Sequence, residues 1–103
     1  MAKKSAAFVK DAVATHSVLS LQVNKGQRHR ITRLGLKRGS LWVTPYTDGY
    51  RLALSGNVKT ILGPKVISLF GGKRGDDQDR IFWHLTYEDN IKSVISEFAV
   101  AAY

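Results

Sequence analysis

Apolar residues recur at helical spacing near both ends of the chain. Close to the N-terminus, this stripe consists of Phe8, Val9, Ala12, Val13 and His16. Ser5 precedes the stripe, and its hydroxyl is a suitable helix N-cap. We therefore predict a helix over residues 5–16 that packs one modest apolar face against a core.

The stripe near the C-terminus is the clearest in the sequence. It places apolar side chains at i, i+3, i+4, i+7 and i+11, namely Ile91, Val94, Ile95, Phe98 and Ala102. Thr86 is the expected N-cap, and Glu88 and Asp89 follow in the first turn, where the helix dipole favours acidic groups. This pattern predicts an amphipathic helix at the end of the chain.

Between these two helices the hydrophobic period changes to two, which is typical of strands. Seven short runs have this character: residues 18–23, 28–36, 41–46, 50–54, 58–62, 66–70 and 81–85. Turn-forming segments separate them, and Thr47-Asp48-Gly49 is a strong hairpin signal. Gly63 and Pro64 divide the fifth run from the sixth. We expect residues 71–80 to form a polar loop before the last strand.

The order of helix, strands and helix predicts an α+β fold. Its sheet is an antiparallel meander of five to seven short strands, either bent and covered by helices or closed into a small, partly open barrel. The 103 residues suit a single domain spanning 1–103. No apolar run approaches the roughly 20 residues that cross a bilayer, so we expect no membrane association and a cytoplasmic location.

The composition narrows the possible chemistry. The chain has no cysteine, which excludes disulfides, thiolate metal sites and a cysteine nucleophile. His16, His29 and His84 have no metal-binding spacing and no catalytic motif beside them. We therefore predict no catalytic residues, no metal and no cofactor, and a protein that is not an enzyme.

Positive charge is concentrated in the first three quarters of the chain. The net charge is +8, and residues 12–47 contain six basic residues and no acid. The last 28 residues carry a net charge of −4. A basic protein of this kind favours a polyanionic partner, with the late acids either covering part of the basic surface or forming an opposite face.

The predicted strand over residues 28–36 carries the densest basic cluster. Arg28 and Arg30 share one face of a pleated strand. Leu34 falls out of phase with the start of the run, so a bulge near Thr32 or Arg33 would bring Arg33 near them or turn it away. Arginine suits phosphate because its planar fork binds two oxygens and its face stacks on a base. We expect these three arginines, with Lys37 and Arg38 in the following turn, to contact phosphates.

The following strand adds aromatic rings. Trp42 and Tyr46 share one face with Thr44, while the other face is aliphatic. Such a face beside the arginine strand would form a platform on which bases stack. The alternative is that Trp42 belongs to the core, as large aromatic side chains of small domains often do.

Secondary contacts are expected at Lys25, in the first hairpin turn, and at Lys73 and Arg74, in the glycine-rich loop. That loop lacks the glycine spacing and the Lys-Ser/Thr pair of a nucleotide-binding P-loop. Its acidic residues also lack the ligand pattern of a calcium loop. The loop therefore adds a basic tip and predicts no metal.

The resulting hypothesis is a small nucleic-acid-binding protein with weak sequence preference. Single-stranded DNA or RNA is slightly favoured over duplex, because the predicted surface is a sheet with aromatic side chains. The alternative is an interaction protein, for example a phage-type inhibitor or assembly factor, whose basic face docks on an acidic protein surface. Independently of this choice, the uncharged C-terminal residues 98–103 are expected to dock within the chain or to form a homodimer through the C-terminal helix, which would double the basic surface.

Overall fold

The computed structural model describes residues 2–72, 75–77 and 79–102. Within these residues it contains three helices and six strands. In chain order they are α1 (Ala7–Ala14), β1 (Leu19–Asn24), β2 (Arg28–Arg33), β3 (Gly39–Pro45), β4 (Tyr50–Gly56), α2 (Asn57–Phe70), β5 (Gly75–Asp77), β6 (Arg80–Leu85) and α3 (Glu88–Val100). The predicted α+β class, with a helix at each end, is confirmed.

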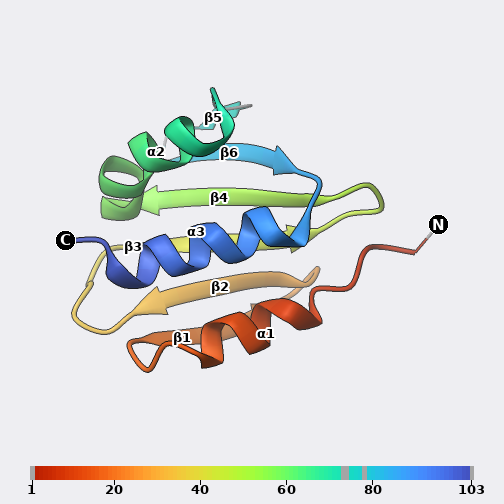
Figure 1. The fold of residues 1–103 in the computed structure, drawn as a ribbon, viewed down its shortest axis with the longest axis horizontal. Coiled ribbons are helices and arrows are strands. Elements are labelled where there is room, and N and C mark those ends of the chain that lie inside the picture. The colour runs from red at the N-terminus through yellow and green to blue at the C-terminus, as the bar shows by residue number, and fades with distance from the viewer. Residues whose placement is uncertain (1, 73–74, 78, 103) are drawn as a thin grey trace.

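The strands form one antiparallel sheet in the order β1-β2-β3-β4-β6-β5 (Figure 1). The first four strands are a meander, and the hairpin predicted at Thr47-Asp48-Gly49 joins β3 to β4. The chain then passes through α2 and β5 before β6 returns to pair with β4. β1 and β5 are the edges of this sheet, so it is an open, bent sheet and not a barrel.

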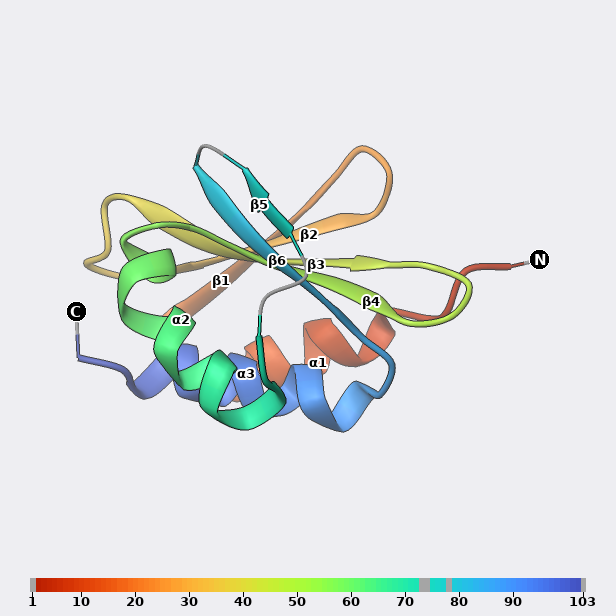
Figure 2. The same cartoon turned by 90° about the horizontal axis from the view of Figure 1, so that it is seen from above.

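All three helices cover the same face of the sheet, and the opposite face carries no helix (Figure 2). The core lies between these two layers. Its largest fully buried side chains include Trp83 and Tyr50 from the sheet and Phe98 from α3. Burial of aromatic and aliphatic side chains of this size is the main favourable contribution to folding. The side chains on the opposite face therefore do not belong to this core.

The two terminal helices form where their hydrophobic stripes predict them, but their ends differ from the predicted ends. The predicted cap at Ser5 is wrong, because the N-cap residue of α1 is Ala6 and its side chain makes no capping hydrogen bond. Ser5 Oγ, one residue earlier, accepts a hydrogen bond from the Ala7 amide at 3.2 Å. The helix also ends at Ala14 and not at His16.

In α3 the four apolar positions from Ile91 to Phe98 are fully buried. The predicted cap at Thr86 is wrong, because Tyr87 is the N-cap residue and its side chain makes no capping hydrogen bond. Ala102 lies beyond the end of α3.

The two strands predicted over residues 58–62 and 66–70 are wrong. These residues form the single helix α2, which contains Pro64 in its interior. Val58, Leu62 and Val66 are buried at intervals of four residues, which is helical spacing. The backbone also passes close to the sheet here, since a Cβ on Gly63 would lie 3.3 Å from Ile81 Cδ1.

Two further expectations need correction. β2 pairs residue by residue with β1 as far as Arg33, so there is no bulge at Thr32 or Arg33. Leu34 is out of phase because it has left the strand, and its side chain is 82% exposed. The polar loop over residues 71–80 is also interrupted by the short strand β5, and Arg80 already belongs to β6.

The end of the chain packs on its own domain as far as it is described. Phe98 and Ala99 are buried within the chain, whereas Val100 is 72% exposed. None of the described helices has the length and apolar character needed to cross a bilayer.

Candidate functional site

The helix-free face of the sheet, called here the open face, carries three rows of side chains across the strands. The central row runs Arg30, Trp42, Ala53 and Phe82, each directly paired with the next. Thr44, Arg51 and His84 form a second row, and Ser40, Ser55 and Arg80 form a third. Arg28 lies on the same face two residues before Arg30. The pleat thus gathers four arginines from three strands on one surface.

These arginines stack on the aromatic rings between them. The guanidinium carbons of Arg28 and Arg30 lie 5.8 and 5.5 Å from the centre of the Trp42 ring. That of Arg51 lies 5.5 Å from the Tyr46 ring and 5.2 Å from the Phe82 ring. The guanidinium carbon of Arg80 lies 5.7 Å from the centre of the Phe82 ring. Positive charge and flat apolar surface therefore alternate over strands β2, β3, β4 and β6.

Two serines hold one end of this arrangement in place. Trp42 Nε1 donates a hydrogen bond to Ser55 Oγ at 3.3 Å. Arg30 Nε donates to Ser40 Oγ at 2.9 Å, and Ser40 is 1% exposed. Ser55 Oγ in turn donates to the Ser40 carbonyl at 3.4 Å. These bonds orient the indole and one guanidinium before any ligand binds, which reduces the entropy lost on binding.

A hollow of about 280 Å³ lies at the middle of the open face. Ala53 and Thr44 also line it, and the aromatic rings and arginines surround it. Ala53 separates Trp42 from Phe82 by two strand spacings, about 10 Å between backbones. Ala53 is only 4% exposed, so the hollow lies between the surrounding rings and arginines and not directly over this side chain.

Acidic residues do not neutralise this surface among the described side chains. The ion pairs among the described side chains are Lys65 with Glu97, His84 with Asp48, and Lys92 with Asp89, and none of them includes an arginine. Asp48, on the β3–β4 turn, has its Oδ1 3.4 Å from Nε2 of His84, which belongs to the second row of the open face. Among these described ion pairs, no arginine of the open face is paired with an acid.

The structure brings Arg28, Arg30, Trp42 and Tyr46 together, as the sequence predicts. Trp42 is half-buried on the open face and is not a core residue. Lys25 is exposed in the β1–β2 turn, where its carbonyl accepts a hydrogen bond from Arg28 Nε at 3.3 Å. The backbone of Lys25 therefore lies beside Arg28 at the edge of the open face.

Arg33 does not join this group. It lies on the helix side of β2, where its Nη1 donates to the Phe98 carbonyl at 3.0 Å and also to the Ala101 carbonyl. Lys37 and Arg38 are exposed in the β2–β3 connection, at the opposite end of β2 from Lys25. Lys73 and Arg74 lie outside the described residues.

Arg51, Arg80 and Phe82 belong to the open face but are absent from the predicted site. The alternation of residues 50–54 already places Arg51 opposite the apolar side chains. Nothing in the linear sequence indicates that β6 pairs with β4, because α2 and β5 separate the two strands. The arginines of β4 and β6 are therefore grouped only by tertiary structure.

Among the described residues, no group of three or more His, Asp or Glu side chains is arranged to bind a metal ion. His29 is 8% exposed on the helix side, and its Nδ1 donates to the Gln27 carbonyl at 2.6 Å. His84 is exposed at the border of the open face, 6.3 Å from the Tyr46 ring centre.

No protein-family model, curated protein or solved structure matches this chain.

Proposed function

We propose that this protein binds single-stranded nucleic acid on the open face of its sheet. The observation that carries the proposal is the stacking of four arginines on Trp42, Tyr46 and Phe82 across one uncovered surface. Aromatic rings stack on bases of any sequence, and arginines contact phosphates, so the affinity is broad and the sequence preference weak.

Single strands suit this surface better than duplexes. The π-faces of bases in a duplex are already stacked on their neighbours, whereas unpaired bases offer them to aromatic side chains. The hollow lined by Trp42, Tyr46 and Phe82 would take one such base. Arg28, Arg51 and Arg80 surround the hollow and would contact the adjoining phosphates.

The test compares a single-stranded DNA, an RNA of the same sequence and a duplex in filter binding at low salt. We expect the single strands to bind more tightly than the duplex. Trp42→Ala should weaken single-strand binding about 5- to 150-fold, since one stacked base contributes roughly 1 to 3 kcal/mol. The matched control is Tyr87→Ala, because Tyr87 is 69% exposed at the start of α3, away from the open face.

A second variant tests the hollow. Ala53→Leu adds a larger side chain to its lining and should weaken binding by occupying the place of the base, while every arginine remains. Equal affinities of wild type, Trp42→Ala and Ala53→Leu would contradict the proposal, provided that their melting temperatures agree.

The alternative occupant of the same face is an acidic protein surface, which arginines also bind. Nuclease treatment separates the two possibilities. Complexes formed through nucleic acid should disappear after digestion, and a saturable protein complex that survives digestion and is lost in Arg51→Ala would favour the alternative.

A further inference from the structure

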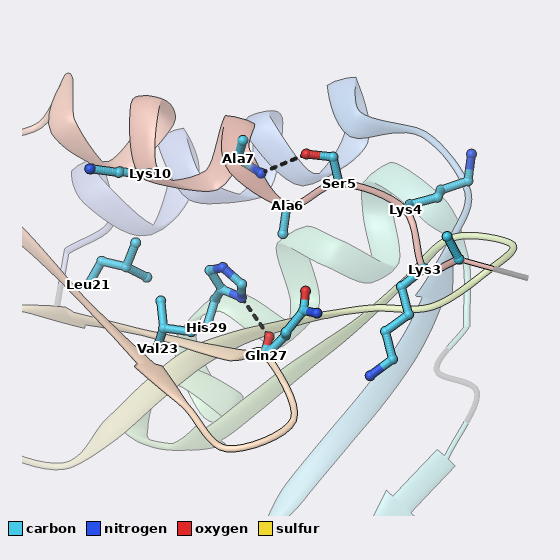
Figure 3. Close-up of a pocket in the computed structure, with 11 residues that line it drawn as sticks. Lys3, Lys4, Ser5, Ala6, Ala7, Lys10, Leu21, Val23, Gln27 and His29 are labelled. Carbon is cyan, nitrogen blue, oxygen red and sulfur yellow. Dashed lines mark hydrogen bonds between the residues drawn. The ribbon is translucent and has the colours of Figure 1, made fainter.

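A second surface lies on the helix side of the sheet, between α1 and the edge strand β1 (Figure 3). It is a groove of about 570 Å³. Leu21, Val23 and His29 line its sheet side, and Val23 is 57% exposed. An exposed valine on an edge strand favours association with another chain.

The outer edge of β1 is unpaired in the described part of the chain. β1 has only β2 as a neighbour, and the backbone hydrogen bonds outside the strand pairs involve none of residues 20–24. Its outward amides and carbonyls are therefore available to an added strand, which is a common way of binding an extended peptide.

Lysines lie at both ends of the groove. Lys10 extends from α1 near Leu21, and Lys3 reaches toward Gln27 at the opposite end, while the Lys4 side chain beside it points away from Gln27 (Figure 3). The segment that carries them is held in place, because the Lys4 amide donates to the Tyr46 carbonyl at 2.8 Å. No acidic residue lines the groove among the described residues.

These features select one kind of occupant. A second copy of the chain would bring its own lysines and a net charge of +8 to the same place, so like charges oppose self-pairing. A nucleic-acid strand would find no Phe, Tyr or Trp ring among the described lining residues, and the imidazole of His29 is only 8% exposed. An extended protein segment with apolar side chains between acidic ones would be complementary to the apolar sheet side of the groove and to the lysines at its ends.

We propose that the groove binds such a segment of a partner protein as an added strand on β1. Two apolar side chains of the segment lie against Leu21 and Val23, and acidic side chains at its two ends contact Lys10 and Lys3. This site lies on the opposite side of the sheet from the arginines, so it is independent of nucleic-acid binding.

The probe is a short capped peptide with two valines on one face, flanked by glutamates and separated by threonines. Titration into the isotopically labelled full chain should shift the backbone amide signals of β1. K3Q/K4Q/K10Q should weaken peptide binding about 10-fold or more, because it removes three attractive charges. The matched control is K59Q/K65Q/K92Q, which makes the same change in net charge on α2 and α3.

The proposal would be overturned if the β1 amide signals did not shift at about 1 mM peptide, a concentration at which even weak binding would be visible. It would also be overturned if both triple variants lost the same peptide affinity, or if a peptide with lysines in place of the glutamates bound equally well. β1 shifts that depend on protein concentration without peptide would assign the edge to a second copy and also refute it. A single-stranded oligonucleotide added before the peptide should leave the β1 shifts unchanged.

Discussion

Arg30 and Arg33 lie three positions apart on β2, and the pleat sends their guanidinium groups to opposite faces of the sheet. Arg30 stacks on Trp42 at the open face. Arg33 instead donates to carbonyls at the end of α3, where a helix leaves its last carbonyls without intrahelical partners. The same residue type therefore contacts an exposed aromatic ring on one face and the carboxyl end of a helix on the other.

Substitution of these arginines should separate the two roles. Arg33→Ala should lower the free energy of unfolding by about 1 to 3 kcal/mol, because it removes the partly buried hydrogen bonds from Arg33 to two backbone carbonyls. It should not change oligonucleotide affinity. Arg28→Ala should do the reverse, weakening binding with little change in stability, since Arg28 is exposed. Urea denaturation measures the change in stability, and filter binding measures the change in affinity. A loss of oligonucleotide affinity in Arg33→Ala, under conditions in which the variant is fully folded, would contradict this assignment.

Tyr50 predicts an alkaline loss of stability. Burial, and then the nearby negative charge of Glu88, raise the pKa of Tyr50 above its ordinary value. The folded state therefore keeps the phenolic proton, which the Tyr50 hydroxyl donates to the Ser5 carbonyl at 3.1 Å. In the unfolded state Tyr50 loses its proton at a lower pH than in the folded state. The stabilisation that the protonated Tyr50 gives the folded state is therefore complete below about pH 10 and is lost as the pH rises further.

The comparison is between wild type and Tyr50→Phe in urea, at about pH 8 and about pH 10.5. The unfolding free energy of wild type should fall more over this interval than that of the variant. The variant itself should be about 1 kcal/mol less stable at the lower pH, because it lacks the hydroxyl donor. Parallel pH dependences would show that Tyr50 does not titrate differently in the two states.

At the scale of elements, α2 shows how a helix can resemble two strands. Its residues are rich in valine and isoleucine, and Gly63 with Pro64 interrupts them, which is typical of strands joined by a turn. Packing overrides these preferences, since Val58, Leu62 and Val66 form a buried stripe only in a helix. Close contact of Gly63 with the side chain of Ile81 brings this helix against β6.

Pro64 should reduce the stability of α2. It has no amide to donate to the carbonyl four residues earlier, and its ring crowds that carbonyl. Pro64→Ala should therefore raise the free energy of unfolding by about 1 to 3 kcal/mol. Thermal melting with circular dichroism measures this change, and Lys59→Ala, in the first turn of α2, is the control. A lower melting temperature in Pro64→Ala would show that the packing of α2 requires the proline.

At the scale of the whole molecule, the two faces of the sheet differ. The helices bury one face, and the other face collects arginines that no described carboxylate pairs with. Under the proposed function, a polyanion would bind to this positively charged face. Binding should consequently release counterions and depend on salt.

The four open-face arginines predict the size of that dependence. If each contacts one phosphate of a single strand, the logarithm of the binding constant should fall with the logarithm of salt concentration with a slope of about −3. Arg51→Ala should reduce the slope to about −2. Lys59→Gln, which removes one positive charge from α2, should leave it unchanged. A slope near zero would refute phosphate contact.

Much of this architecture can be predicted from the sequence. The stripe from Ile91 to Phe98 predicts α3, and the alternation around Trp42 predicts which face carries the rings. These features are local, because the period of a helix or a strand determines which side chains share a face. The basic character of the β2 strand is local in the same way.

Three features were decided only by tertiary structure: the pairing of β6 with β4, the helical state of α2 and the role of Arg33. Each depends on contacts between residues far apart in the chain, and Arg33 bonds to carbonyls 65 and 68 positions away. Local periodicity contains no information on which distant element lies opposite a given face. The sequence therefore determined the side chains available for an aromatic and basic surface, and the packing of the helices determined which face remained open to display them.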